Sequence, residues 1–226
     1  VGGLRQGGLD VVFVIDATGS MGWLIDEVKE RVRHLANWIR SLVPTTRFGV
    51  VAYRDHDDPE FVTQIRTLTL SVRKVKRFLA ELETRGGGDL PEAVGAGLER
   101  AIADAGWKRD SKRVIIVVGD APPHAERMAA NLAAVRAFQA QGGTVTTLDV
   151  SFDANPELAA RQLKRRVEEL QTLQPRGPLD EFVALAQAGG GDASTLKGDL
   201  QVVRQLAVLI FGEEWAEDLR PLLGEL

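Results

Sequence analysis

The chain has 226 residues, of which 44% are hydrophobic, and it carries a formal net charge of −4 with a sequence pI near 5.5. This length suits one substantial core rather than two, so we expect a single domain over residues 1–226. The negative charge argues against a protein that binds nucleic acid through its phosphates, because such a protein needs a basic face. The chain has no cysteine, which excludes disulfides, zinc–thiolate sites and thiol catalysis but leaves the redox compartment open.

The N-terminal sequence VGGLRQGG is glycine-rich and polar, and it does not resemble a cleavable signal peptide. No stretch approaches the roughly 20 apolar residues that a membrane-spanning helix needs. We therefore expect a cytoplasmic protein, or a domain of a longer chain, without a membrane span.

The sequence LDVVFVIDATGSM, residues 9–21, joins a buried strand to a polar turn. Five consecutive apolar residues, 11–15, are typical of a strand that is buried on both faces of a parallel sheet. Asp16, Thr18 and Ser20 follow at alternate positions, at the end of the strand where open α/β sheets bind their ligands. The alternative is that Ser20 only caps the next helix, Asp16 only solvates the strand end and Thr18 only fills the turn.

Strands and helices alternate along the rest of the chain. We predict further strands near residues 48–53, 61–70, 113–119, 144–150 and 193–196, and helices near residues 24–44, 72–83, 91–102, 126–141, 157–173, 179–188 and 200–211. The strands at 48–53 and 61–70 are joined by a short polar loop, so they should be antiparallel. Pro91 should start the helix at 91–102, because a missing N–H costs nothing at that position.

The predicted core spans residues 9–211, followed by a C-terminal extension at 212–226. The highly charged helix near 157–173 is interpreted as part of an inserted helical segment, residues 154–177, on the surface. Solvated charge pairs are commoner than a binding patch in such a helix.

This alternation predicts an α/β fold: a doubly wound, Rossmann-like, mostly parallel sheet with one antiparallel edge strand and helices on both faces. A second apolar strand ends at Gly119 and Asp120, which repeats the pattern of the first. With the first strand central, the winding reverses between the strands that end at Asp16 and Asp120, so their carboxylates should converge. The glycine run 86–88 precedes Asp89, and this loop should lie at the same edge.

The side chains collected at this edge carry only hard oxygen donors, which suit Mg²⁺ or Mn²⁺ better than Zn²⁺ or copper. Without a cation, three carboxylates within a few ångströms would repel one another, and at least one would hold a proton. The pattern resembles the von Willebrand factor type A (VWA) domain, whose metal-ion-dependent adhesion site (MIDAS) uses an Asp-x-Ser/Thr-x-Ser motif, a loop threonine and a later aspartate. By this resemblance the metal ligands are Asp16, Thr18, Ser20, Asp89 and Asp120.

Most members of that family have threonine where this chain has Asp89. The loop GGGDLPEA, with YRDH before it and DAPPH after it, resembles a subgroup related to hemicentin and to VWA domains beside some alpha-type kinases. The resemblance implies a metal-dependent module for adhesion or scaffolding, in which bound Mg²⁺ or Mn²⁺ accepts an oxygen from a protein partner. His56 and His124 lie on loops at the same rim, but imidazole is a poor ligand for a hard cation.

The other function class is a Mg²⁺-dependent phosphohydrolase that uses Asp16 and Asp120. Three features disfavour it: no second acid follows Asp16 two residues on, no lysine lies in the site-forming stretches, and no glycine loop ends in Lys-Ser/Thr. We therefore expect a protein without enzymatic activity.

Overall fold

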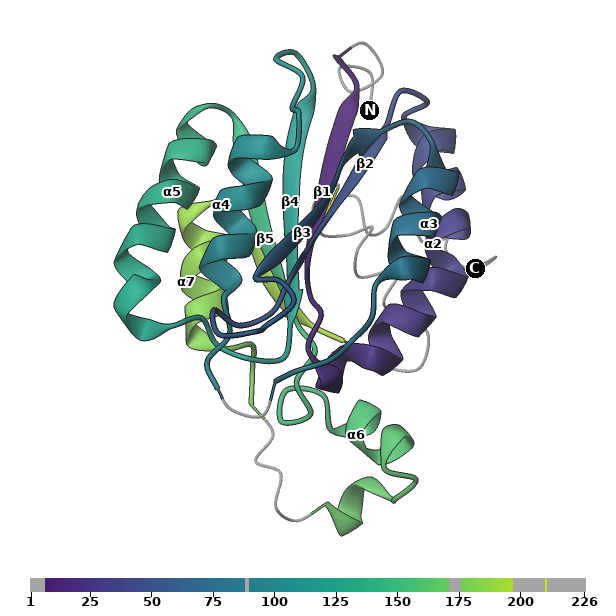
Figure 1. The fold of residues 1–226 in the computed structure, drawn as a ribbon, viewed down its shortest axis with the longest axis vertical. Coiled ribbons are helices and arrows are strands. Elements are labelled where there is room, and N and C mark those ends of the chain that lie inside the picture. Colours follow the sequence, from purple (N-terminus) through teal and green to yellow (C-terminus); the bar gives the residue numbers. More distant parts are fainter. Residues whose placement is uncertain (1–6, 88–89, 171–175, 197–209, 211–226) are drawn as a thin grey trace.

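The computed structural model describes residues 7–87, 90–170, 176–196 and 210. Its centre is a six-stranded sheet with the order β3-β2-β1-β4-β5-β6, covered by helices on both faces (Figure 1). Neighbouring strands run parallel, except that β2 and β3 are antiparallel. The predicted doubly wound α/β fold with one antiparallel edge strand is confirmed.

The elements follow the predicted order, with small differences at their ends. The strands are β1 (Leu9–Asp16), β2 (Arg47–Tyr53), β3 (Thr63–Thr69), β4 (Lys112–Gly119), β5 (Gly143–Asp149) and β6 (Gly190–Thr195). The helices that cover the sheet are α2 (Gly22–Leu42), α3 (Val72–Glu81), α4 (Val94–Asp104), α5 (Met128–Ala140) and α7 (Asp180–Ala188). The connections contain α6 (Pro156–Gln162) and the 3-10 helices η1 (Gly19–Met21), η2 (Ala125–Arg127) and η3 (Val167–Glu169).

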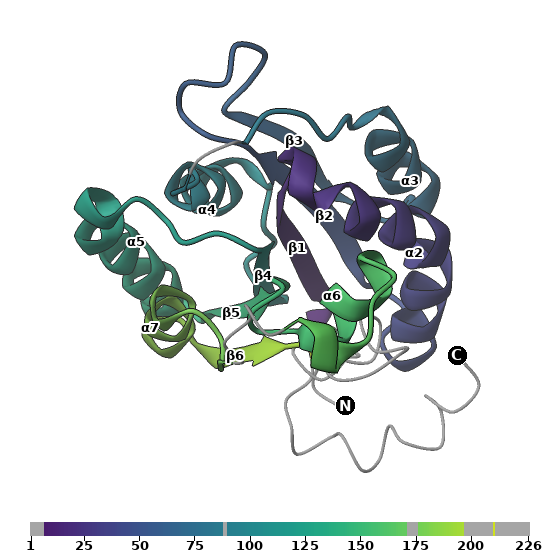
Figure 2. The same cartoon turned by 90° about the horizontal axis from the view of Figure 1, so that it is seen from below.

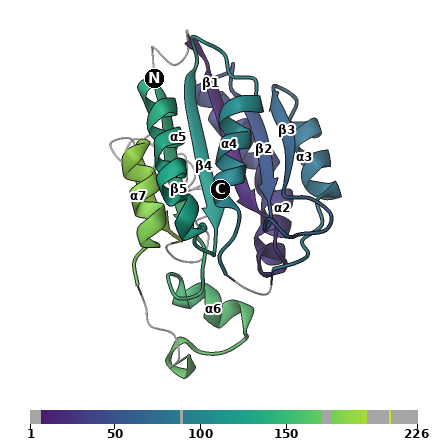
Figure 3. The same cartoon turned by 60° about the vertical axis from the view of Figure 1, so that its left-hand side comes forward.

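The side chains of β1 alternate between two hydrophobic cores. Val11, Phe13 and Ile15 pack in the core beneath α2 and α3. Val12 and Val14 pack in the core beneath α4, α5 and α7. Figure 3 shows the two helix layers on opposite sides of the sheet. Because both faces are covered, β1 requires apolar side chains at every position of its centre.

The carboxyl ends of β1, β2 and β4 meet at one edge of the sheet, onto which Figure 2 looks. Asp16 is paired with Tyr53 of β2, and Ile15 is paired with Val118 of β4. Asp120 comes directly after the end of β4, so the register brings it beside the end of β1. Figures 1 and 3 show α6 beyond this same edge.

The predicted helix start at Pro91 is wrong, because α4 begins at Val94. The N–H of Glu92 donates to the carbonyl oxygen of Pro122 at 3.0 Å, and Glu92 pairs with Pro123 in an isolated parallel bridge. This bridge holds the backbone extended and ties it to the loop after β4. Glu92 is thereby placed at the carboxyl edge of the sheet.

The single helix predicted at 157–173 is also wrong in its extent. α6 ends at Gln162, and Lys164 has a φ of 52°, a left-handed conformation that a continuing helix does not adopt. Leu170 then packs with Ala159 and Ala160 in a small cluster of its own. The segment is therefore a folded lobe with its own apolar contacts.

Several predicted features lie outside the described residues: Asp89, the last helix at 200–211 apart from Ile210, and the extension at 212–226. Ile210 is buried in the core beneath α2 and α3. In the part of the chain that the structure describes, no helix is long and apolar enough to cross a membrane.

Candidate functional site

Asp16 ends β1 with a carboxylate that is 0% exposed. Its Oδ1 accepts hydrogen bonds from the backbone N–H of Thr18 at 2.8 Å and from the Thr18 hydroxyl at 2.7 Å. Its Oδ2 has no hydrogen-bond partner among the described residues. A buried carboxylate oxygen without a partner costs free energy. No described residue compensates this cost.

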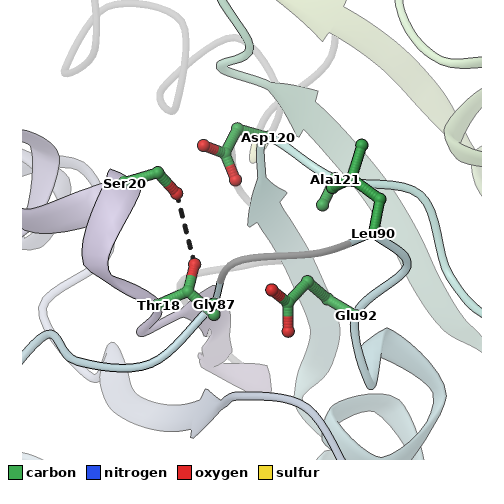
Figure 4. A pocket seen from close by; sticks show the side chains of 7 residues that line it. All are labelled: Thr18, Ser20, Gly87, Leu90, Glu92, Asp120 and Ala121. Atoms are coloured by element: carbon green, nitrogen blue, oxygen red, sulfur yellow. Dashed lines mark hydrogen bonds between the residues drawn. The ribbon is translucent and has the colours of Figure 1, made fainter.

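Thr18 and Ser20 are positioned by the short turn η1, and their hydroxyl oxygens lie 3.3 Å apart. Neither η1 nor α2 has a side-chain hydrogen bond at its N-cap, and the N-cap of α2 is Met21 and not Ser20. The alternative that Ser20 only caps the helix is therefore wrong. Figure 4 shows the two hydroxyls pointing toward each other on one side of a pocket.

The pocket has a volume of about 290 Å³ and is lined by Thr18, Ser20, Gly87, Leu90, Glu92, Asp120 and Ala121. The carboxylates of Asp120 and Glu92 approach it from the side opposite the two hydroxyls (Figure 4). The structure thus places Asp16, Thr18, Ser20 and Asp120 at one edge of the sheet.

The fifth predicted ligand, Asp89, lies outside the described residues. Among the residues that are described, no three His, Cys, Asp or Glu side chains lie close enough to form a metal-binding group by themselves. The described part of the site therefore consists of a pair of acidic groups, Asp16 and Asp120, with the hydroxyls of Thr18 and Ser20.

Burial and mutual repulsion raise the pKa values of the acidic groups at this edge. Loss of hydration, followed by the charge of Asp120, raises the pKa of Asp16 to about 7. Burial raises the pKa of Asp120, against a hydrogen bond from Ser20 that lowers it. Burial, and then the charges of Asp16, Asp120 and Glu92, raise the pKa of Tyr53. The edge therefore disfavours negative charge as long as no cation compensates it.

Gly87 forms part of the wall of the pocket. The N–H of Gly19 donates to the carbonyl oxygen of Gly86 at 3.0 Å. Gly86 and Gly87 have φ values of +70° and +69°, a conformation that glycine adopts at little cost. A Cβ added at Gly87 would lie 2.9 Å from the Cβ of Thr18. These glycines are required by their backbone conformation and by the close approach of the loop to the Asp16–Ser20 turn.

Arg54 connects the loops around the site, although it is only 1% exposed. Its guanidinium donates to the carboxylates of Asp58 at 3.1 Å and Glu60 at 2.9 Å, and to the carbonyl oxygen of Glu83 at 2.7 Å. Its own carbonyl oxygen accepts a hydrogen bond from the N–H of Ala93 at 3.2 Å. Arg54 therefore holds the loop after β2 against both ends of the glycine loop.

Sequence reasoning missed Arg54, Tyr53 and Glu92. Arg54 and Tyr53 lie at the end of a strand that was recognised by its apolar residues alone. Glu92 was assigned to a helix. The available signals were the sequence YRDH, which contains Tyr53 and Arg54, and the carboxylate after Pro91 in the sequence GGGDLPEA.

His56 and His124 lie together on the rim, with ring centroids 5.2 Å apart. The Nε2 of His124 is 2.7 Å from the Oδ1 of Asp55. Neither histidine lines the pocket, so their contacts are with the rim loops themselves.

Comparisons with known proteins agree with this architecture. A family model for the von Willebrand factor A domain matches residues 10–198. The alpha-protein kinase vwkA of Dictyostelium discoideum is 31% identical over 118 residues, which cover 51% of this chain and 19% of that protein. A putative ariadne-like RING finger protein, R811, of Acanthamoeba polyphaga mimivirus is 29% identical over 120 residues, covering 53% of this chain and 12% of that protein. The matches thus span less than a fifth of either relative.

Solved structures share the fold at lower identity. The conserved hypothetical protein BatB from Bacteroides thetaiotaomicron has a TM-score of 0.62 at 16% identity, over 90% of this chain and 97% of that one. The SpRpn10 VWA domain has a TM-score of 0.58 at 13% identity, over 88% and 93%. The pilus adhesin SpaC from Lactobacillus rhamnosus GG has a TM-score of 0.60 at 13% identity, over 93% of this chain and 30% of the adhesin.

The first prediction concerns Arg54. Arg54→Met should lower the free energy of unfolding by about 3 kcal/mol or more, because it leaves the carboxylate of Asp58 without its buried cation. Arg85→Met is the matched control, since Arg85 is 63% exposed and its ion pairs are solvated; its effect should stay within about 0.5 kcal/mol. Urea unfolding of both variants measures the difference, and equal effects would contradict the role given to Arg54.

The second prediction concerns pH. The pKa of Asp16 is about 7 in the folded, metal-free chain against an ordinary 3.8, so the folded state binds this proton more tightly than the unfolded state. The stabilising contribution of Asp16 is therefore fully present below about pH 4, and it is lost as the pH rises to about 7.

Asp16→Asn keeps the shape of the side chain but cannot ionise. In EDTA, the variant should become more stable than wild type as the pH rises from 4 to 7, with a difference above pH 7 of at most about 4 kcal/mol. Urea unfolding at a series of pH values tests this. A difference that does not change with pH would show that Asp16 does not titrate in this range.

Proposed function

The chain belongs to the von Willebrand factor A domain family, and from that premise we propose that it is a protein-interaction module with a divalent cation at a MIDAS-type site. Domains of this family are commonly interaction modules. The observation that carries the proposal is the buried Oδ2 of Asp16, which has no described hydrogen-bond partner.

The chemistry of the described donors fits Mg²⁺ or Mn²⁺. Asp16 and Asp120 offer carboxylate oxygens, Thr18 and Ser20 offer hydroxyl oxygens, and hard cations prefer oxygen ligands. The raised pKa values of both aspartates mean that a nearby cation would relieve an existing electrostatic cost. Asp89 is proposed as a further ligand from the glycine loop.

In this proposal the chain holds the cation from one side only, and the cation supplies a coordination position for an oxygen of the partner protein. Thr18 and Ser20 orient toward the pocket through their contact at 3.3 Å. Asp120 stands opposite them. A site that gathers its ligands from three separate loops exists only in the folded chain, so binding of the cation should stabilise the fold.

We propose that the module has no catalytic activity of its own, with a protein as its partner and a cytoplasmic location. The name of vwkA describes a kinase, but the match covers 19% of that protein. The described residues lining the pocket include no lysine, arginine or histidine that would bind a phosphoryl group. Phosphoryl transfer needs such positive charge beside the metal, so the phosphohydrolase alternative is not favoured.

The third prediction tests the cation. At pH 8, wild-type protein treated with EDTA should gain about 2.7 kcal/mol when free Mg²⁺ reaches 100 times its dissociation constant, which is roughly 5–10 °C in Tm for a chain of this size. Asp16→Asn should show equal melting curves with and without Mg²⁺. Wild-type curves that coincide in EDTA and in excess Mg²⁺ or Mn²⁺ would overturn the proposed site.

The fourth prediction separates the two function classes. Purified protein with Mg²⁺ or Mn²⁺ should release no phosphate from phosphomonoesters or nucleotides above the level of Asp16→Asn. Turnover by wild type that is abolished in Asp16→Asn would replace the interaction module with an enzyme.

A further inference from the structure

Glu92 is a buried carboxylate on the wall of the pocket. It is 3% exposed, it lines the same space as Thr18, Ser20 and Asp120, and its carboxylate points toward that space (Figure 4). Glu92 is not one of the proposed metal ligands, and it precedes helix α4, which begins at Val94.

The backbone fixes Glu92 from two sides. Its N–H donates to the carbonyl oxygen of Pro122, and the next N–H, that of Ala93, donates to the carbonyl oxygen of Arg54. The residue is therefore anchored between the loop after β4 and the loop after β2. These hydrogen bonds fix the backbone from which the carboxylate of Glu92 reaches the wall of the pocket.

The charged side chains among the described residues that line the pocket are all acidic. Glu92 and Asp120 line the pocket, and Asp16 accepts hydrogen bonds from Thr18. Burial, and then the charges of all three carboxylates, raise the pKa of Tyr53. Among the described residues that line the pocket, none is basic. The charges of Glu92, Asp120 and Asp16 together exceed that of one divalent cation even before the proposed ligand Asp89 is counted, so a loaded site would have no excess positive charge for an anionic partner.

Because of this balance, we propose that Glu92 determines which group of a partner the site accepts: an uncharged oxygen donor, such as an amide or hydroxyl, in place of a carboxylate. Glu92 supplies a negative charge beside the cation from within the chain, and this charge repels a carboxylate of the partner protein. The exposed side chain of Leu90, 68% exposed at the mouth of the same pocket, adds an apolar contact for the partner residue that carries the donor. This inference rests on the proposed cation site.

The experiment uses Mn²⁺ as the probe at pH 8. Free Mn²⁺ is measured by electron paramagnetic resonance to give the affinity, and displacement of Mn²⁺-bound water by acetate or acetamide is followed by proton relaxation. Glu92→Gln should bind Mn²⁺ roughly tenfold more weakly and should bind acetate at roughly tenfold lower concentration than wild type, because one nearby unit charge is lost. Its response to acetamide should not change.

Two further variants separate charge from structure. Glu126→Gln removes a carboxylate that is 73% exposed and lies on the same rim outside the pocket lining, and it should behave as wild type. Glu92→Asp keeps the charge and should keep the discrimination against acetate. If Glu92→Asp and Glu92→Gln respond to acetate alike, or if Glu92→Gln matches wild type, the inference is wrong. If wild type does not bind Mn²⁺ at all, the proposed cation site itself fails.

Discussion

The buried carboxylate of Asp16 at the end of the central strand is the constraint on which the rest of the site depends. Two other aspartates of the sheet are equally buried and show how the fold treats such a charge. Asp10 binds Arg47 at 2.6 Å, and Asp149 binds Arg176 at 2.8 Å. Asp16 receives hydrogen bonds from Thr18 alone and has no described cation. The buried charge is compensated in two cases, whereas no described residue compensates it in the third, at the edge where open α/β sheets bind their ligands.

Those two compensated aspartates are structural, because each also joins separate segments. Asp10 accepts hydrogen bonds from the N–H of Lys108 and the hydroxyl of Ser111. Asp149 does the same with the N–H groups of Ser151 and Leu179. Asp16 makes no comparable link to a distant segment among the described residues. Its hydrogen bonds with Thr18 stay within the turn that follows β1.

The local signals in the sequence were sufficient for the fold. The run of apolar residues in β1 predicts burial on both faces, and the repeated pattern at β4 predicts where the winding reverses. The wrong interpretations have tertiary causes. Proline at 91 is compatible with a helix start, but the pairing of Glu92 with Pro123 decides the conformation. The helical segment does not continue through Lys164, which has a left-handed φ. Lysine gives no signal of this conformation in the sequence. Arg54 was missed because its partners, Asp58, Glu60 and the carbonyl oxygen of Glu83, come together only in three dimensions.

The difference between local signals and tertiary contacts also explains why the sequence pattern that identified the other acids did not identify Glu92. Asp16 and Asp120 directly follow buried strands, so a topological rule locates them. Glu92 reaches the edge through its pairing with Pro123 after β4, and beside it Gly87 passes against Thr18 at a point where a Cβ would find no room. Gly87 therefore has no room to shift toward Thr18. The backbone that carries the acid is held by hydrogen bonds to Pro122 and Arg54. A charge placed in the wall in this way discriminates between ligands, because it repels a ligand group of the same sign.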